Sequence, residues 1–483
     1  MKLSDTSLFK QQCLIDGEWV AAKDGSTFDV GNPATGAVIG SMPRLDISQT
    51  KTAIEAADRA WPTWRSRTAG ERAEILHRWH SLIQENADDL AMIMTTEQGK
   101  PLAEAKGEIA YAASFVKWFA EEAKRIYGEV IPNNVPGRRL LVLKQAVGVV
   151  AAITPWNFPA AMITRKIAPA LAAGCTVVAR PASETPYTAV ALLELAVRAG
   201  VPAGVVNLIT GKASEQGYEL TNSPLVRKVT FTGSTEIGKL LMSQSASTVK
   251  RISLELGGNA PFLVFDDADI DAAVEGAIAS KFRNAGQTCV CANRILVQDG
   301  VHDLFVEKLI AAVGKLKVGA GDEPGVAIGP LIDDSALDKV EEHIEDAESK
   351  GGKVVLGGHR HKLGGKFFEP TVLVDATEQM KLASEETFGP LAPIIRFKTE
   401  EEAIRIANNT EFGLAAYFYA RDVGRIWRVA EDLEAGLIGI NEGIISTEVA
   451  PFGGVKESGI GREGAHQGID EYLEVKYLAM GGV

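Results

Sequence analysis

The segment 281–294 holds the residues best suited to covalent chemistry. It contains two of the four cysteines, Cys289 and Cys291, one residue apart. Small and polar residues lead into Cys289, so we expect a turn that leaves the thiol accessible. An accessible thiol near cations and backbone N–H groups tends to ionise, and the thiolate is the nucleophile. A buried, inert cysteine is one alternative. Half of a metal site is another, although a closed zinc site needs about four ligands, and Cys13 and Cys175 stand alone.

A carboxylate lies upstream of this cysteine. Glu255 and Leu256 precede two glycines, and this pattern lets a side chain project from the end of a strand into a cleft. A solvated glutamate in an ordinary turn is the alternative. Together, Cys289 and Glu255 offer a nucleophile and a general base.

Four motifs in order make the chain resemble the aldehyde dehydrogenase superfamily over nearly its whole length. They are PWNFP at 155–159, LELGG at 254–258, GQTC at 286–289 and ETFGP at 386–390. The resemblance implies that Cys289 attacks an aldehyde carbon to form a thiohemiacetal, which loses a hydride to become a thioester. It also implies that Glu255 activates the hydrolytic water, and that Asn157 and the Cys289 backbone N–H stabilise the oxyanion.

A glycine-containing turn at 233–238 is the candidate phosphate site. It differs from the usual dinucleotide fingerprint, and a plain strand-to-helix turn is the alternative. A helix starting near Thr235 would direct its N-terminus at a pyrophosphate, with the Ser234 hydroxyl as a further donor. The resemblance implies that Glu386 holds the nicotinamide ribose beside Phe388. We expect the remaining cofactor contacts from Thr154, Pro155, Trp156, Arg180, Ser183, Gly233, Gly238 and Leu256.

The segment after residues 176–180 bears on the choice of cofactor. Position 183 is serine, where relatives that prefer NAD often carry an acid that bonds the ribose and repels a 2′-phosphate. Arg180 replaces the usual family lysine and can pair with a phosphate through two N–H groups. The neighbouring acid Glu184 argues against a phosphate at this position. We predict that NADP is the cofactor, with NAD possible.

The resemblance narrows to the NADP-using succinate-semialdehyde dehydrogenases through MITRK at 162–166, KFRN at 281–284 and EGIIS at 442–446. It implies that Arg165, Arg283 and Ser446 hold the far carboxylate of succinate semialdehyde while the aldehyde is oxidised to succinate. Pairing of either arginine with a structural acid is the alternative. Glutarate semialdehyde or a broader range of aldehydes remains open.

Other functions compete with this interpretation. A catalytically inactive structural relative is disfavoured by the joint presence of Cys289, Glu255 and Asn157. A CoA-acylating relative characteristically lacks the carboxylate found here as Glu255. A cysteine hydrolase would leave the nicotinamide-binding half unexplained. Cys291 is a candidate redox partner of Cys289 through a strained disulfide, or a small residue that packs in the core.

Composition narrows the class of protein. The 483 residues are 46% hydrophobic and 23% charged, which predicts a globular protein of two or three domains. A net charge of −13 argues against a nucleic-acid partner. No apolar run approaches the roughly 18 residues of a membrane helix. Four cysteines without framework spacing and a start without an apolar core favour a cytoplasmic enzyme. Nothing in the expected chemistry requires a metal.

The elements that must position these residues follow an α/β pattern. Continuous apolar runs at 148–153, 176–180, 205–209 and 228–231 alternate with helical segments, which predicts a Rossmann-type parallel sheet covered on both faces. We expect a dinucleotide-binding domain at 1–127 and 147–255, and an α/β catalytic domain at 256–460. The segments 128–146 and 461–483 resemble a small β oligomerisation arm, which implies a homo-oligomer, either a dimer or a tetramer.

Overall fold

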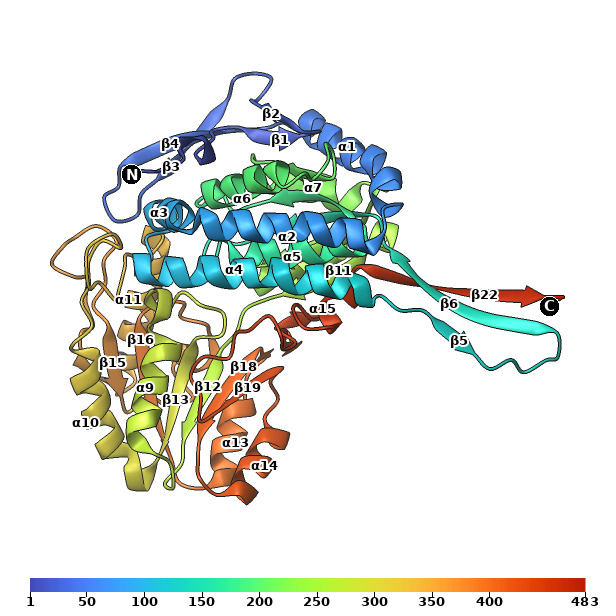
Figure 1. Ribbon diagram of the computed structural model, residues 1–483. Helices are drawn as coiled ribbons and strands as arrows, with labels where there is room; N and C mark the ends of the chain where they lie inside the picture. Colours follow the sequence, from blue (N-terminus) through green and yellow to red (C-terminus); the bar gives the residue numbers. More distant parts are fainter. Residues whose placement is uncertain (483) are drawn as a thin grey trace.

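Two hydrophobic cores divide the molecule, for which the computed structural model describes residues 1–482. The first core is built from residues between 8 and 256, together with Ile469, Tyr472 and Leu473. The second is built from residues between 260 and 452. Figure 1 shows the first body, blue to green, above the second, yellow to red, with a narrow arm projecting to one side. The predicted α/β fold is confirmed, whereas the domain limits stay a prediction.

The N-terminal part of the first body contains two short hairpins and a layer of helices. The strands are β1 (Cys13–Ile15), β2 (Glu18–Val20), β3 (Thr27–Gly31) and β4 (Val38–Pro43), and the helices are α1 (Ile47–Arg65), α2 (Ala69–Glu85), α3 (Ala87–Gln98) and α4 (Leu102–Glu122). Local sequence sets their ends: Thr68 and Glu71 form a capping box at the start of α2, and Gly99 ends α3 at a φ of 92°.

The first body is centred on an eight-stranded sheet in the order β2-β1-β9-β8-β7-β10-β11-β21. Its parallel strands are β7 (Val149–Ile153), β8 (Thr176–Arg180), β9 (Val206–Leu208), β10 (Val226–Thr232) and β11 (Arg251–Glu255), and β21 (Gly459–Ile460) joins antiparallel. The connecting helices are α5 (Ala161–Ala173), α6 (Pro186–Arg198), α7 (Ala213–Asn222) and α8 (Thr235–Ser245). In register, Ile153 pairs with Arg180 and Phe231, so the carboxyl ends of these strands form one edge. Ligands bind at that edge in open α/β sheets.

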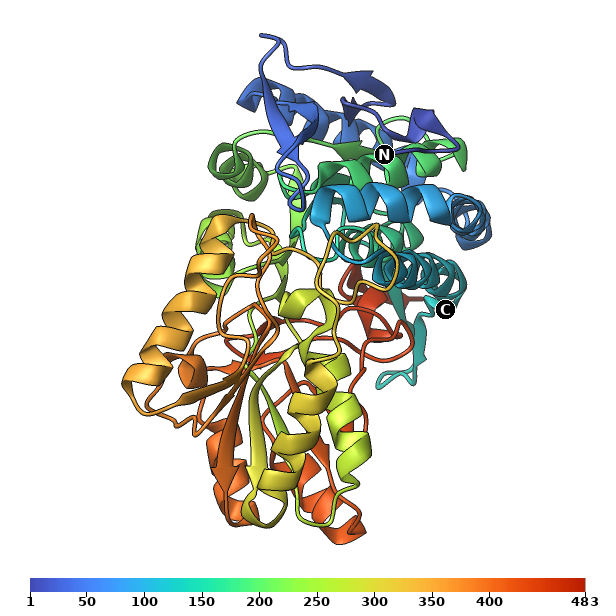
Figure 2. The same cartoon turned by 90° about the vertical axis from the view of Figure 1, so that its left-hand side faces the viewer.

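The second body repeats the architecture with a seven-stranded sheet in the order β14-β15-β16-β13-β12-β18-β19 (Figure 2). Its strands are β12 (Ala260–Val264), β13 (Ala292–Gln298), β14 (Lys353–Leu356), β15 (Thr371–Val374), β16 (Leu391–Phe397), β18 (Ala415–Tyr419) and β19 (Leu437–Ile440). Its helices are α9 (Ile270–Lys281), α10 (His302–Val313), α11 (Asp334–Ser349), α12 (Lys381–Ser384), α13 (Glu400–Asn408) and α14 (Val423–Asp432). Asp269 caps α9 by accepting from the backbone N–H of Ala272.

The arm is a three-stranded antiparallel sheet in the order β22-β6-β5 (Figure 1). It consists of β5 (Glu129–Ile131), β6 (Arg138–Ala146) and β22 (Leu473–Gly481), with β6 and β22 paired from Leu473–Ala146 to Gly481–Arg138. The remaining short elements are β17 (Phe412–Gly413), β20 (Val455–Lys456), α15 (Gln467–Asp470) and the 3-10 turns η1 (Thr6–Leu8), η2 (Ala123–Arg125), η3 (Ala246–Thr248), η4 (Arg283–Gly286) and η5 (Asp299–Val301). Within residues 1–482, no helix has the length and apolar character needed to cross a membrane.

Candidate active site

Cys289 lies in a tight loop between η4 and β13. Three consecutive residues of η4 that lead into this loop, Asn284, Ala285 and Gly286, have left-handed φ angles of 52°, 55° and 77°. A Cβ on Gly286 would lie 2.2 Å from the Gly389 carbonyl oxygen, and one on Gly258 would lie 2.4 Å from the Cys289 carbonyl oxygen. The glycines on both sides therefore let the cysteine loop pack directly against the ends of neighbouring segments.

A buried polar network holds this strained loop. The Asn284 amide donates to the carbonyl oxygens of Asn157 (3.0 Å) and Gln287 (3.2 Å) and accepts from Gln98 (3.0 Å). Lys100 also donates to the Asn157 carbonyl, at 2.7 Å. Because two left-handed non-glycine residues cost of order 1–3 kcal/mol each, such a network must stabilise them. Sequence reasoning did not single out Gln98 or Lys100, and it recognised Asn284 and Gln287 only as motif members without this role, because their partners lie up to 186 positions away.

Two cavities meet at Cys289. One encloses about 270 Å³ and is lined by Glu104, Gly107, Glu108, Tyr111, Phe158, Ala161, Met162, Arg165, Arg283, Thr288, Cys289, Val290, Ser446 and Phe452. We call it the arginine cavity. The other encloses about 240 Å³ and is lined by Pro155, Trp156, Asn157, Thr232, Gly233, Ser234, Leu256, Gly257, Cys289, Glu386 and Phe388. We call it the aromatic cavity. A group bound to Cys289 can thus be reached from both sides.

The Cys289 thiol is less acidic than its sequence context indicates. Burial raises its pKa to about 12, and the charges of Arg165 and Arg283 only partly oppose this effect. The side chain is partly exposed, so the readily ionised thiol stays a prediction, which desolvation opposes. Desolvation of the thiolate outweighs the two cations, so deprotonation needs a base or a bound ligand that changes the environment.

Glu255 is the candidate base. It is the last residue of β11, is buried, and has no hydrogen-bond partner for Oε2 among residues 1–482. Burial and then the charge of Glu463 raise its pKa well above the ordinary value. It is close enough to Cys289 for its charge to raise the thiol pKa. A buried carboxyl with a raised pKa and a free oxygen is suited to accept and release a proton.

Asn157 lies on the aromatic-cavity side of Cys289. Its amide nitrogen donates to the Gln287 carbonyl oxygen at 3.1 Å, and its amide oxygen accepts from the Phe158 backbone N–H at 3.1 Å. An amide nitrogen carries two protons, so one N–H group remains for a further acceptor. The buried side chain is thereby fixed with a donor left over, as an oxyanion site requires.

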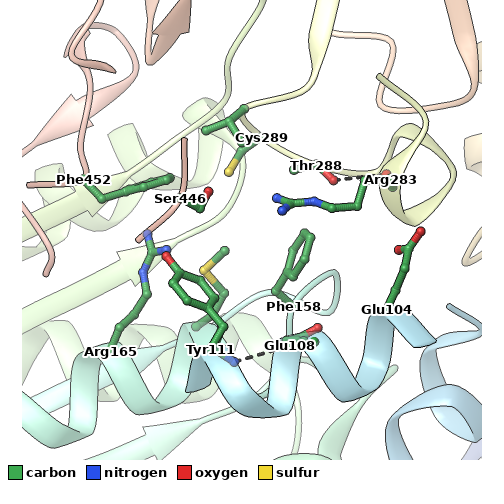
Figure 3. Close-up of a pocket in the computed structure, with 14 residues that line it drawn as sticks. Glu104, Glu108, Tyr111, Phe158, Arg165, Arg283, Thr288, Cys289, Ser446 and Phe452 are labelled. Carbon is green, nitrogen blue, oxygen red and sulfur yellow. Dashed lines mark hydrogen bonds between the residues drawn. The ribbon is translucent and has the colours of Figure 1, made fainter. Parts of the chain in front are cut away.

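Two guanidinium groups reach the arginine cavity from opposite walls (Figure 3). Arg165, on α5, donates through Nε to Glu463, while its buried Nη2 has no partner among residues 1–482. The Arg283 guanidinium lies 5.1 Å from the Phe158 ring centre and takes no part in the hydrogen bonds or ion pairs of residues 1–482. Ser446 lies near Cys289 in the same view. Arg165 therefore has a structural acid partner and an unpaired donor at once.

The aromatic cavity contains a carboxylate and two rings. Trp156 and Phe388 meet edge to face with centres 5.6 Å apart. Glu386 accepts from the Gly258 backbone N–H at 3.3 Å, and burial raises its pKa to about 8. Phe388 has a left-handed φ of 54°. A flat ring stacks against a base, and a neighbouring carboxyl group accepts hydrogen bonds from hydroxyl groups, so this pair suits the base and ribose of a nucleotide.

The turn after β10 lies beside this cavity. Ser234 caps α8 by accepting from the Ile237 backbone N–H, and both Gly233 and Ser234 line the cavity. A Cβ on Gly238 would lie 2.4 Å from the Leu256 side chain. Gly238 therefore lets α8 pack against Leu256, and its contact with a cofactor stays a prediction.

Four of the predicted cofactor residues lie outside the aromatic cavity: Thr154, Arg180, Ser183 and Gly238. The backbone N–H of Thr154 donates to the carbonyl oxygen of Arg180, which joins the ends of β7 and β8. The Arg180 side chain is buried, and its Nε has no partner among residues 1–482. An unpaired buried guanidinium N–H fits an anion at this edge of the sheet.

Cys291 points away from its neighbour. It is buried, and its thiol donates to the Lys281 carbonyl oxygen at 2.9 Å, whereas Cys289 borders the two cavities. Both are free thiols. A disulfide between them requires the Cys291 side chain to leave this bond and rotate, so the redox pairing stays a prediction.

The sequence interpretation assigned no role to two further titratable residues, Glu463 and His343. Glu463 contacts both Arg165 and Lys166. His343 is buried on α11, where Nδ1 lies 3.0 Å from the Thr387 hydroxyl and Nε2 lies 3.4 Å from Glu385. It thus contacts the residues on both sides of Glu386. Neither lies near the cysteine in sequence, and neither stands in the recognised motifs.

Comparison with known proteins identifies the family. The family model for the "Aldehyde dehydrogenase family" matches residues 19–478. The chain is 65% identical over its whole length to the whole of a glutarate-semialdehyde dehydrogenase of Pseudomonas aeruginosa. It is 64% identical, again over the whole of both chains, to an NADP-dependent succinate-semialdehyde dehydrogenase of Escherichia coli. A solved structure of an NADP-dependent enzyme of E. coli superposes with a TM-score of 0.99 at 64% identity, covering 99% of this chain and 100% of that one. The recognised motifs and the two cavities that share Cys289 therefore have a common explanation: this chain belongs to the aldehyde dehydrogenase family.

Proposed function

We propose that this protein oxidises succinate semialdehyde to succinate with NADP⁺, through a covalent intermediate on Cys289. The observation that carries the proposal is the arginine cavity, in which two guanidinium groups with free N–H donors line the same space as the cysteine. An aldehyde with a carboxylate at its far end matches this arrangement. Binding the carboxylate holds the aldehyde carbon in position for attack, which lowers the entropic part of the barrier.

The residues around Cys289 would carry out the chemical steps one after another. Cys289 Sγ, once deprotonated, attacks the aldehyde carbon, and the oxyanion accepts hydrogen bonds from Asn157 and from the Cys289 backbone N–H. A bound nicotinamide would supply a hydride acceptor on the aromatic-cavity side of the adduct. Loss of the hydride from the adduct carbon re-forms the carbonyl and leaves a thioester on Cys289. Glu255 then takes a proton from the water that hydrolyses the Cys289 thioester, and the carboxylic acid leaves. The unpaired Oε2 of Glu255 supports this role.

The residues of the aromatic cavity fit a dinucleotide. Trp156, Glu386 and Phe388 would hold the nicotinamide and its ribose, and Ser234 at the start of α8 would meet the pyrophosphate. Arg180 and Ser183 would hold the 2′-phosphate of NADP, as the unpaired Arg180 Nε supports. The NADP-dependent relative in E. coli agrees with this choice.

Glutarate semialdehyde is the second candidate substrate. The relative that is 65% identical acts on it by name, and it differs from succinate semialdehyde by one methylene group. One methylene discriminates by only about 1–3 kcal/mol. The ratio of kcat/KM for the two semialdehydes decides between them, and a ratio in favour of glutarate semialdehyde would replace the proposed substrate.

The arginines provide the decisive experiment. Arg165→Ala and Arg283→Ala each remove charged hydrogen bonds worth on the order of 1.5–3 kcal/mol, so we expect the KM for succinate semialdehyde to rise roughly ten- to a hundred-fold. Butanal, which has no carboxylate, should show little change. Equal losses on both aldehydes would contradict the carboxylate clamp and leave an aldehyde dehydrogenase of other specificity.

The arm supports a proposed homo-oligomer. It exposes apolar side chains on all three strands, including Val130 of β5, Leu143 of β6, and Val475 and Tyr477 of β22, and such a surface is normally covered by a partner. We assign 128–146 and 461–483 to oligomerisation, 1–127 and 147–255 to cofactor binding, and 256–460 to catalysis. Four free cysteines suit the cytoplasm. Mass measurement in solution, with Val475→Lys as the disrupting variant, tests the oligomer.

A further inference from the structure

Glu463 is a buried acid that links the C-terminal segment to the arginine cavity. It lies between β21 and α15, and its backbone N–H and C=O both pair with Phe452, at 2.7 and 2.8 Å. One carboxylate oxygen accepts from Arg165 Nε, and the other accepts from Lys166 Nζ. Phe452 itself lines the arginine cavity. The backbone pairing of Glu463 with Phe452 therefore fixes both the buried acid and one side of the arginine cavity.

The contacts of Glu463 leave Arg165 with one free end. The Phe452 ring centre lies 4.1 Å from the guanidinium carbon of Arg165, and the Phe115 ring centre lies 5.9 Å from it. Glu463 occupies Nε, whereas the buried Nη2 has no partner among residues 1–482. In Figure 3 the guanidinium points up from α5 toward Ser446 and Cys289. The group is thus clamped on one side and available to an acceptor in the cavity.

The charges around Arg165 also favour an acceptor in the cavity. Arg165 and Lys166 are adjacent cations, both buried, and Lys166 also donates to the Thr232 hydroxyl at 2.6 Å. Glu463 contacts both cations, and Glu255 is a second acid close enough for its charge to act on them. Arg283, which lines the same cavity, takes no part in the ion pairs of residues 1–482, and this unpaired charge favours an anion in the cavity. The carboxylate of a semialdehyde substrate would supply it.

We propose that Glu463 is a positioning residue that determines selectivity for aldehydes with a terminal carboxylate. It acts by holding Arg165 Nε, so that the Nη2 end stays directed at the substrate carboxylate. Glu463 itself does not touch the substrate. The inference rests on the carboxylate clamp proposed above and extends it to a residue 298 positions away in the chain.

The test is the ratio of kcat/KM for succinate semialdehyde to kcat/KM for butanal. Both aldehydes use Cys289 and Glu255, so any effect of the substitution on those groups cancels in the ratio. We expect Glu463→Gln, which keeps the shape and removes the charge, to lower the ratio about tenfold, the equivalent of losing one charged hydrogen bond. Glu463→Asp, which withdraws the carboxylate from its two partners, should lower it as well and serves if the glutamine variant does not fold.

Two controls separate the possible outcomes. Glu474→Gln changes an exposed acid of the same C-terminal region, paired with Arg251 at 2.7 Å, and should leave the ratio unchanged. A parallel loss on both aldehydes in Glu463→Gln, or an unchanged ratio, would overturn the positioning role. Arg165→Ala, measured beside it, tests the clamp. If Arg165→Ala lowers the ratio and Glu463→Gln does not, only the inference about Glu463 fails. If Arg165→Ala leaves it unchanged, the clamp itself fails.

Discussion

The two cavities that meet at Cys289 are built in different ways. The arginine cavity depends on long charged side chains, and Arg165 is held by an acid 298 positions away. The aromatic cavity depends on backbone and compact groups: Gly233, the cap of α8, and a carboxylate bonded to a backbone N–H. All the aromatic-cavity residues except Thr232 stand in segments recognised from the sequence, whereas Glu463, which holds Arg165 in the arginine cavity, stands in none of them.

Removing the residue that both cavities share should have the largest effect. Cys289→Ala deletes the nucleophile, so we expect activity to fall to a trace on every aldehyde. The aromatic cavity keeps its other lining residues, so the dissociation constant for NADP should stay near that of the wild type. Titration calorimetry with NADP and an absorbance assay for reduced cofactor measure the two quantities. Substantial residual activity would remove Cys289 from the chemistry.

Glu255→Gln should separate the two halves of the reaction. General-base catalysis contributes about 10²–10⁴-fold, so the steady rate should fall by that order while a rapid burst of reduced cofactor remains. Burial and Glu463 raise the Glu255 pKa, and the base must be deprotonated, so the wild-type steady rate should rise as pH increases through that pKa. Stopped-flow absorbance across pH distinguishes these effects. A variant with the wild-type steady rate would exclude Glu255.

The nucleotide side is tested by Arg180→Ala. If Arg180 binds the 2′-phosphate, the KM for NADP should rise roughly ten- to a hundred-fold through the lost charged hydrogen bonds, while the KM for NAD changes little. Ser183→Ala should show the same preference more weakly. An enzyme that favours NAD from the outset, or a variant that uses NADP unchanged, would contradict the assignment.

The two thiols should differ in reactivity. Burial raises the Cys289 pKa to about 12, so alkylation by iodoacetamide in the free protein should accelerate about tenfold per pH unit across the neutral range. Cys291 is buried and bonded to Lys281, and it should stay unmodified. Peptide mass spectrometry identifies the labelled residue. A rate that is already constant at pH 7 would indicate an ionised Cys289.

The smallest effect is expected for Cys291→Ala. The thiol contributes one weak hydrogen bond and a small packed volume, so activity should stay within about twofold of the wild type. If Cys291 leaves that bond to form a disulfide, peroxide inactivation should be reversed by dithiothreitol in the wild type and prevented in the variant. Equal and irreversible inactivation of both proteins would leave Cys291 as a packing residue.

Much of the site could be predicted because it is encoded in short segments. Glu255 ends a strand before two glycines, Cys289 follows a glycine-containing loop, and Ser234 begins a helix. Continuous apolar runs that alternate with helical segments likewise predicted the parallel sheet of the first body. Such features depend on neighbours within a few residues, so they can be recognised without knowing the fold.

Other properties arise only where distant segments pack. The sequence by itself determined which groups can react, since side-chain type and motif spacing are local. The tertiary structure decided how acidic they are and which donors stay free. Burial raises the pKa of Cys289 against two nearby arginines, and Glu463 occupies one end of Arg165 while leaving the other open. Both results depend on desolvation and pairing in the folded interior, which sequence distance does not reveal.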